Sequence, residues 1–344
     1  MRAACYYGPR NIKIEDMEIP EINDDEVLIE TYTIGICPTD IRYYLGLKGE
    51  STYDNEKFTT GKDTYGLSGH EAVGKIVKIG KNVKKFKIGD FVVHETFTYC
   101  GECEFCKEGK INLCPNKKDI ARGYSEYFKV PYKFLHLLPE DIDIDDAAFA
   151  EPLAVVLHAV KKVKNNSKDV AVIGAGPMGI LISFALKLNG IDPAILEINE
   201  NRRKFANELG FKNTINPEEE DFKNKIELIT KYGFDGVISS IGGKGPLNLG
   251  LSITKPGGMF IIFGGTYPKD YIELDPNAIH YSEKIITGSS DHDYDDMEEA
   301  IEIIRKREIP LKKIVTKKFS LNELNNAFES VISGNEMKVQ IKVK

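Results

Sequence analysis

Five of the six cysteines in this chain stand at positions that suit a metal. Cys100, Cys103, Cys106 and Cys114 follow the spacing C-x2-C-x2-C-x7-C, and four thiolates are enough to close a tetrahedral zinc site. Because the protein itself would fill such a site, we expect it to hold a lobe of the chain together and to take no part in chemistry.

A second set of metal-binding residue types is spread along the first half of the chain. Cys37 offers a sulfur, the pair His70 and Glu71 offers an imidazole and a carboxylate, and Glu151 offers another carboxylate. This set has too few strong ligands to fill the metal's coordination sphere, so it predicts an open site. A closed and an open site in one chain predict an enzyme that uses metal to activate an oxygen. Spacing alone leaves an alternative, in which these are a buried thiol, a core histidine and a helix-starting acid.

Other uses of the four-cysteine cluster fit less well. Four closely spaced thiols left free, as surface thiols or a redox pair, would be prone to oxidation. A zinc ribbon for nucleic acid is opposed by the acidic neighbours Glu102, Glu104 and Glu108. The net charge of −7 also provides no basic excess to neutralise phosphates, so we expect no nucleic-acid partner.

Length and composition describe an ordinary globular enzyme. The chain has 344 residues, with 42% hydrophobic and 29% charged, which predicts two domains. Residues 1–7 read as a strand, with no charged segment followed by an apolar one, and no apolar run is long enough to cross a bilayer. We therefore expect a cytoplasmic protein with no membrane partner, in which close-spaced cysteines bind metal. Cys5 is expected to be a small core residue.

The chain changes character along its length. Residues 1 to about 150 contain short apolar runs closed by glycine and proline, which is typical of a β-rich domain. From Asp169 onward, strands alternate with helices, which predicts a doubly wound parallel sheet and an α/β fold class. Two amphipathic helices and a final strand follow after about residue 290, so the α/β block is inserted between two parts of the first domain.

A dinucleotide site is predicted between a strand at 170–173 and a helix at 178–188. The connecting residues form a complete G-x-G-x-x-G, Gly174-Ala175-Gly176-Pro177-Met178-Gly179. Its glycines allow a tight turn and close approach of the backbone to a pyrophosphate, which the following helix N-terminus attracts. A glycine turn that serves only packing is the alternative.

Two further features bear on the cofactor. Glu197 ends the next strand, where a carboxylate binds the ribose hydroxyls and repels a 2′-phosphate, so NAD is favoured over NADP. Arg202 and Arg203 lie nearby in the sequence and complicate that choice. Later strands end in Ser240-Ile241-Gly242 and Phe263-Gly264, whose glycines make room for the nicotinamide half, although each also fits an ordinary turn.

These motifs together resemble the zinc-dependent medium-chain dehydrogenase/reductase superfamily over the whole chain. Residues 69–74 (GHEAVG) are similar to its zinc signature, residues 35–40 to its first ligand segment and residues 100–114 to its structural zinc lobe. Residues 150–155 (AEPLAV) resemble the polyol branch typified by sorbitol dehydrogenase, in which a glutamate replaces a cysteine of the alcohol dehydrogenases.

The resemblance implies an architecture. A GroES-like catalytic domain would span residues 1–152, with the zinc lobe at about 94–116. A Rossmann NAD-binding domain would occupy 153–289, and 290–344 would return to the catalytic domain. A homodimer or homotetramer is expected, with one catalytic and one structural zinc per chain.

The resemblance also implies roles for residues near the reaction. Cys37, His70 and Glu151 would hold the catalytic zinc, and Glu71 would bind it directly or through water. Thr39 matches the hydroxyl that takes the first step of a proton relay. Tyr43 matches a polyol-branch position near the substrate.

The chain departs from the family pattern at four places. Arg42 stands where many alcohol dehydrogenases continue the relay with a histidine, and Pro38 stands where glycine is common. The stretch 44–67 is longer than expected and either caps the substrate pocket or elaborates the surface. Residues 289–292 (SSDH) replace a Phe-Arg-Tyr segment of sorbitol dehydrogenases, which weakens the sorbitol assignment.

The resulting hypothesis is a zinc enzyme that transfers a hydride between NAD and a secondary hydroxyl of a polyol or sugar-derived substrate. The alternatives in the same class act on a simple secondary alcohol, L-threonine or glucose. A non-catalytic NAD- or zinc-binding member of the fold is the alternative from another class. It predicts a lost metal ligand, and the sequence keeps them all.

Overall fold

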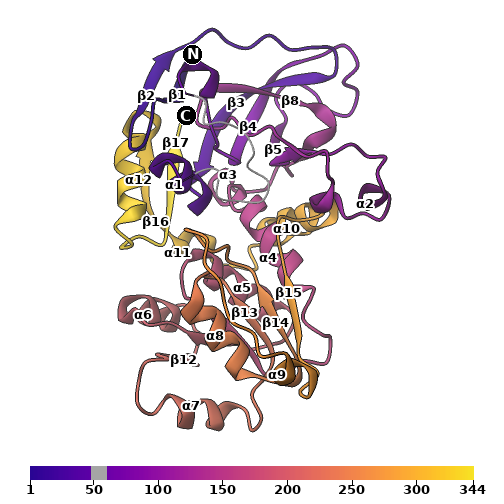
Figure 1. The fold of residues 1–344 in the computed structure, drawn as a ribbon. Helices are drawn as coiled ribbons and strands as arrows, with labels where there is room; N and C mark the ends of the chain where they lie inside the picture. The colour runs from indigo at the N-terminus through magenta and orange to yellow at the C-terminus, as the bar shows by residue number, and fades with distance from the viewer. Residues whose placement is uncertain (48–59) are drawn as a thin grey trace. The chain divides into compact units, whose positions relative to one another are not determined.

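The computed structural model describes residues 1–47 and 60–344, which form two compact units. One unit comprises Met1–Ala154 and Asp293–Lys344, and the other comprises Val155–His292. The fold class predicted from the sequence is confirmed, since the first unit is rich in β-structure and the second is built on a parallel sheet with helices (Figure 1).

The first unit is organised around a seven-stranded sheet in the order β16-β17-β3-β4-β5-β9, with β8 also paired to β3. The long strands β3 and β4 are antiparallel, and β17, at the end of the chain, pairs antiparallel with β3. The strands of this unit are β1 (Arg2–Tyr6), β2 (Ile12–Asp16), β3 (Glu26–Gly35), β4 (Glu71–Ile79), β5 (Phe91–His94), β6 (Phe97–Thr98), β7 (Lys118–Asp119), β8 (Tyr127–Pro131), β9 (Leu135–Leu137), β16 (Val315–Ser320) and β17 (Lys338–Lys342).

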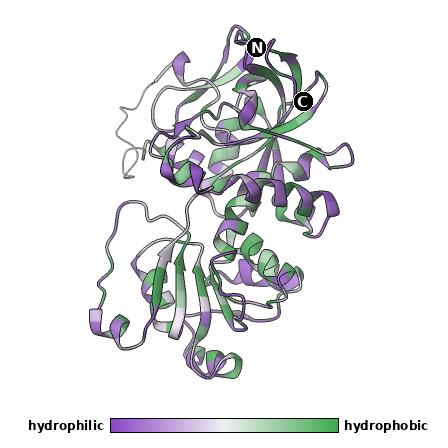
Figure 2. Cartoon of the chain, turned by 90° about the vertical axis from the view of Figure 1, so that its right-hand side faces the viewer, coloured by the Kyte–Doolittle hydropathy of each residue, from purple (hydrophilic) through white to green (hydrophobic). Residues whose placement is uncertain are grey.

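The second unit contains a six-stranded parallel sheet in the order β12-β11-β10-β13-β14-β15. Its central strand β10 is fully buried, and the sheet strands carry mostly hydrophobic residues (Figure 2). The strand order reverses at β10, which is where open α/β sheets bind their ligands. The strands are β10 (Val170–Ile173), β11 (Ala194–Leu196), β12 (Thr214–Ile215), β13 (Phe234–Ser239), β14 (Thr254–Ile262) and β15 (Ile285–Gly288).

Most helices begin or end at residues suited to that place. Pro38 opens one helix, and Gly46 ends it in the left-handed conformation. In residues 1–47 and 60–344, no helix has the length and apolar character needed to cross a membrane. The helices are α1 (Pro38–Leu45), α2 (Glu104–Lys107), α3 (Ile144–Ala147), α4 (Ala150–Val160), α5 (Pro177–Leu188), α6 (Glu200–Glu208), α7 (Phe222–Ile229), α8 (Lys244–Ile253), α9 (Pro276–His280), α10 (Tyr294–Lys306), α11 (Leu311–Ile314) and α12 (Leu324–Ile332).

The core of the first unit joins distant parts of the chain. Tyr124 and Phe128 are fully buried and pack in one cluster with Phe328 of α12. Cys5 is buried in the same unit, as expected of a small core residue. Of the long stretch 44–67, residues 48–59 lie outside the described residues, so its role as a pocket cap or a surface elaboration stays a prediction.

Candidate active site

The first unit brings Cys37, His70 and Glu71 together. Cys37 is the N-cap of α1, and Glu71 begins β4 directly after His70. One ligand atom from each of the three residues lies within 4.8 Å of the others. A thiol, an imidazole and a carboxylate are a donor set that zinc accepts, so these residues fit the metal that the sequence implies.

Asp40 lies behind the imidazole of His70 and connects it to its surroundings. Its carboxylate accepts hydrogen bonds from the Cys37 backbone N–H at 2.9 Å, from the Tyr124 hydroxyl at 2.7 Å and from Ser68. His70 Nδ1 is 3.6 Å from Asp40 Oδ1 and 3.3 Å from Ser68 Oγ. Metal-ligating histidines characteristically direct their second nitrogen to a carboxylate in this way.

Sequence reasoning did not single out Asp40, although a local signal was present. Asp40 is the third residue of α1 and forms a capping box with Cys37, after a proline at the first helical position. Pro at the first position and an acid at the third are a helix-start pattern. The same hydrogen bond that begins the helix therefore fixes the carboxylate beside His70.

Negative charges concentrate around His70. Burial on its own lowers the pKa of His70, but the charges of Cys37 and Asp40 raise it well above its ordinary value, and Glu151 acts in the same direction. Glu151, at the start of α4, is not part of the three-residue cluster that shares the 4.8 Å spacing, yet its charge acts on the same site. A cation at this place would meet several compensating anions.

Lys338, the first residue of β17, is a member of the site that the sequence did not predict. Its side chain is 4% exposed, and its ammonium lies 2.5 Å from Glu71 Oε2 and 2.7 Å from Oε1. It also donates to the Ile36 carbonyl at 3.1 Å. Burial alone would lower the pKa of Lys338, but the Glu71 charge raises it, so the lysine stays protonated.

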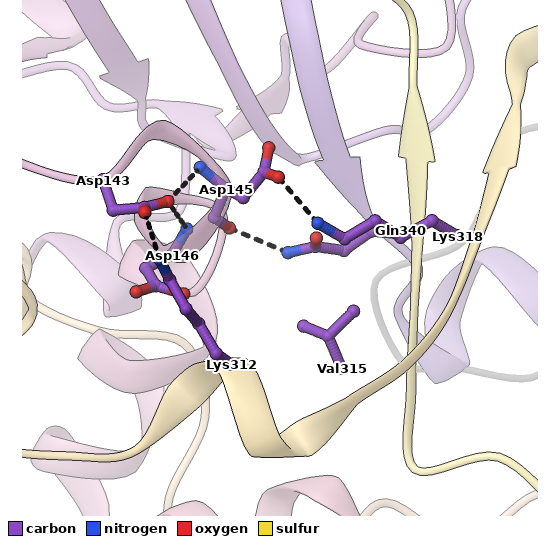
Figure 3. Close-up of a pocket in the computed structure, with 7 residues that line it drawn as sticks. All are labelled: Asp143, Asp145, Asp146, Lys312, Val315, Lys318 and Gln340. Atoms are coloured by element: carbon purple, nitrogen blue, oxygen red, sulfur yellow. Dashed lines mark hydrogen bonds and ion pairs between the residues drawn. The ribbon is translucent and has the colours of Figure 1, made fainter.

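A network on the same face of β17 ties this strand to α3. Figure 3 shows a pocket in which the Gln340 side chain donates to the Asp145 carbonyl at 2.8 Å and Lys318 pairs with the Asp145 carboxylate at 2.7 Å. Lys342 binds the same carboxylate at 2.6 Å. Side chains two residues apart share a face of a strand, so Lys338 lies on the same face of β17 as Gln340 and Lys342.

The predicted relay and substrate residues lie on one side of α1. Thr39 and Tyr43 are four residues apart and both partly exposed, whereas Tyr44 is buried against the core. Arg42 Nη2 donates to Thr39 Oγ1 at 3.2 Å. Thr39 therefore has a fixed neighbour on its own helix and retains its hydroxyl hydrogen for another acceptor.

The four-cysteine lobe lies around α2. The sulfurs of Cys100, Cys103, Cys106 and Cys114 all lie within 4.8 Å of one another. The Cys103 backbone N–H donates to the Cys100 sulfur at 3.4 Å, and amides of this loop lower the pKa of the Cys100 thiol to about 6. The arrangement fits a tetrahedral thiolate site closed by protein ligands.

The glycine-rich loop of the second unit joins β10 to α5. Gly174 has a φ of +99°, and a side chain on Gly179 would come within 2.0 Å of the Gly174 carbonyl oxygen. Gly176 is the N-cap of α5, with Pro177 and Met178 opening the helix. A side chain on Gly176 would meet only the Arg202 guanidinium, at 3.8 Å. The first and third glycines thus serve packing, and the second leaves backbone open to a ligand.

Glu197 is buried at the end of β11 with its carboxylate fixed from two sides. One oxygen accepts from the Ala175 backbone N–H and the other from the Asn199 N–H, both at 2.8 Å. Each oxygen keeps capacity for a further donor, as a ribose hydroxyl would provide.

Two other loops follow neighbouring strands at the same edge of the sheet. Ile241 and Gly242 follow β13, and Phe263 and Gly264 follow β14. A side chain on Gly264 would approach the Ser240 carbonyl oxygen to 2.6 Å, so the two loops are in close contact. Ile241 is 43% exposed, which leaves an apolar surface at the carboxyl ends of the strands.

Comparison with known proteins links these units to families. Residues 23–140 match the alcohol dehydrogenase GroES-like domain, and residues 177–306 match the zinc-binding dehydrogenase family. The chain is 34% identical to D-arabitol-phosphate dehydrogenase of Enterococcus avium over 95% of its length and 92% of that protein. It is 31% identical to sorbitol dehydrogenase of Bacillus subtilis, covering 96% of this chain and 94% of that one.

A solved structure agrees with these relatives. The fold superposes on 2R,3R-butanediol dehydrogenase of Bacillus subtilis with a TM-score of 0.86 and 27% identity. The match covers 100% of this chain and 99% of the other.

Proposed function

Because the chain belongs to the zinc-dependent medium-chain dehydrogenase/reductase superfamily, in its polyol dehydrogenase branch, we propose that it oxidises a secondary hydroxyl of a polyol or sugar-derived substrate with NAD. The observation that carries the proposal is the grouping of Cys37, His70 and Glu71 within 4.8 Å in one unit. Its second support is a glycine-rich loop of cofactor-binding form in the other unit.

The proposed reaction removes a proton from the hydroxyl oxygen and a hydride from its carbon, which leaves a ketone. Bound zinc would supply the Lewis acid that lowers the pKa of the hydroxyl, and bound NAD the acceptor for the hydride. Cys37, His70 and Glu151 would hold the metal, and Asp40 would orient His70. Thr39 would hydrogen-bond the substrate oxygen and receive its proton first.

The substrate class follows from the polar side of α1 and from the relatives. Tyr43 offers a phenol hydroxyl on the same helix face as Thr39, and a charged arginine lies between them. Substrates with several hydroxyl groups, or with an anionic group, suit such a surface better than simple alcohols do. The names of the relatives include a polyol phosphate, a polyol and a diol.

The cofactor preference rests on Glu197. Its carboxylate is fixed by two backbone N–H groups and is 6% exposed, so it has little freedom to move away from a 2′-phosphate. We therefore propose NAD, with the adenosine ribose on Glu197 and Arg202 and the pyrophosphate at Gly176.

The test is reduction of NAD and NADP at 340 nm with polyols, polyol phosphates, threonine, glucose and simple secondary alcohols. Chelator-sensitive reduction of NAD with one group of polyols is the expected result. Chelator-resistant turnover would contradict a metal-dependent reaction. No turnover in a protein that retains two zinc ions would contradict the proposed substrate class.

The assembly is proposed to be a homodimer or homotetramer. The edge strand β15 of the parallel sheet has no charged residue, and the apolar side chains of Ile285 and Tyr281 beside it are 40% and 81% exposed. An uncharged, apolar edge of this kind favours association with another chain. Sedimentation analysis tests this, and a monomer at micromolar concentration would contradict it.

The compartment is proposed to be the cytoplasm. All six cysteines are free, and four of them are close enough to share a metal. Thiols kept for metal binding need reducing surroundings. Fractionation of cells that produce the protein would test this placement.

A further inference from the structure

The ion pair between Lys338 and Glu71 occupies the inner side of the proposed metal site. The two residues are 267 positions apart in sequence, and both are almost fully buried. Both Glu71 oxygens face the Lys338 ammonium, at 2.5 and 2.7 Å. A further hydrogen bond from Lys338 to the Ile36 carbonyl, at 3.1 Å, fixes the ammonium to the backbone directly after β3.

The place where the Glu71 carboxylate lies depends on Gly35. A side chain at Gly35 would come within 1.8 Å of Glu71 Oε2 and within 3.1 Å of the Lys338 side chain. The last residue of β3 thus provides the space in which the pair forms. The Lys338 ammonium attracts the Glu71 carboxylate, and the missing side chain of Gly35 leaves room for it.

Glu71 has two possible partners in this site. Its carboxylate belongs to the group whose ligand atoms lie within 4.8 Å of one another, together with Cys37 and His70. A buried carboxylate needs a positive partner, because removing one member of a buried ion pair leaves a charge uncompensated. Lys338 and a metal at Cys37 are therefore competitors for Glu71.

We propose that Lys338 is a positioning residue that holds Glu71 away from the metal and so keeps one coordination position open for the substrate. The inference rests on the metal site of the proposed function. With Zn²⁺ bound, the site would hold two cations, the metal and Lys338, and Glu71 pairs with the second of them. Without Lys338, Glu71 can recover a positive partner only by binding the metal.

The proposal predicts that removing the Lys338 charge makes zinc release slower rather than faster. We expect Lys338→Met to slow the release of one of the two zinc ions, whereas damage to a merely structural residue would speed it. Outer-shell substitutions change metal affinity by about 10- to 100-fold, so we expect release to be slower by at least about tenfold. Lys338→Arg keeps the charge and should release zinc at the wild-type rate.

The measurement follows zinc release from the holoenzyme into excess 4-(2-pyridylazo)resorcinol, with turnover recorded in parallel. Lys342→Met is the matched control, because Lys342 lies on the same face of β17 and pairs with Asp145. Adding Glu71→Gln to Lys338→Met should abolish the slowing, since no carboxylate remains to bind the metal. Unchanged or faster release in Lys338→Met, or slowing that persists in the double variant, would overturn the proposal.

Gly35→Ala tests the same inference without removing a charge. Its methyl group would displace the Glu71 carboxylate from Lys338, so zinc release should again be slower than in wild type. Normal release from a folded Gly35→Ala protein would count against the proposal, even if Lys338→Met does not fold. Zinc release needs no substrate, so a failure of the proposed reaction would appear separately, as absent turnover in the wild type.

Discussion

The Arg42 guanidinium donates a hydrogen bond to the Thr39 hydroxyl, with 3.2 Å between Nη2 and Oγ1. Arginine stays protonated at all physiological pH values and has no acceptor, so it cannot pass on a proton received from Thr39. Arg42 therefore cannot continue the proposed relay beyond Thr39.

Arg42→His should create a titrating step that the wild type lacks. We expect the pH profile of kcat/KM to gain an inflection near about pH 6.5, the ordinary pKa of histidine. Arg42→Gln removes the charge without adding a titrating group and serves as the control. Identical profiles for the two variants would contradict a relay through this position.

Asp40→Asn should weaken metal binding at the site formed by Cys37 and His70. The substitution keeps the shape of the side chain but removes the charge beside His70, and such outer-shell changes lower metal affinity by about 10- to 100-fold. Competition with a chelator of known zinc affinity measures the effect. Tyr124→Phe removes one hydrogen bond to Asp40 and should give a smaller loss. Equal affinity in Asp40→Asn and wild type would contradict this role.

The difference between Asp40 and Lys338 shows how far sequence reasoning reaches. Asp40 lies three residues after Cys37 and belongs to a helix-start pattern, so it was readable from local sequence. Lys338 reaches the site only because β17 pairs antiparallel with β3, where Gln340 lies opposite Gly35. The register of strands that are distant in sequence is set by the whole sheet, and no local pattern specifies it.

The features that could be predicted are compact in sequence. The four cysteines span residues 100–114, and the glycine loop has both its strand and its helix beside it. The parallel sheet could also be predicted, because each strand and the helix that follows it are adjacent in the sequence. The grouping of Cys37 with His70 came from resemblance, because 33 positions of chain separate them and spacing alone left an alternative.

Replacing a ligand of one proposed zinc site should affect turnover, and replacing a ligand of the other should affect local stability. Cys37→Ala should abolish turnover while leaving the fold intact, since the residue lies at a helix N-cap and is only partly buried. Cys103→Ala should loosen the lobe around α2 and any assembly that depends on it. Zinc content, circular dichroism and limited proteolysis distinguish the two. Wild-type activity in Cys37→Ala would refute the zinc mechanism.

His136 should make the stability of the first unit depend on pH. Burial alone lowers its pKa, but hydrogen bonds to Glu298 at 2.5 Å and Glu95 at 2.7 Å raise the pKa above its ordinary value. A raised histidine pKa stabilises the fold fully below about pH 6.5, and the effect is lost as the pH rises through the raised pKa.

Glu298→Gln tests this dependence. The Glu298 side chain is half exposed, so we expect a loss of about 1 kcal/mol, or about 2–4 °C in the unfolding midpoint, at pH 6. The difference from wild type should shrink as the pH rises toward 9. A difference that is constant across this range would show that the charge of His136 is not involved.

Glu197→Ser should shift the cofactor preference toward NADP. The wild-type carboxylate is fixed by the N–H groups of Ala175 and Asn199, so it would face the 2′-phosphate of NADP at close range. Like charges brought together at an interface cost several kcal/mol. Removing that charge leaves the Arg202 guanidinium of α6, which a side chain at Gly176 would meet at 3.8 Å. We expect the ratio of kcat/KM for NADP to that for NAD to rise by at least about tenfold. Glu200→Ser, on the exposed start of α6, is the control, and an equal shift in both variants would show that net charge rather than the fixed carboxylate decides the preference.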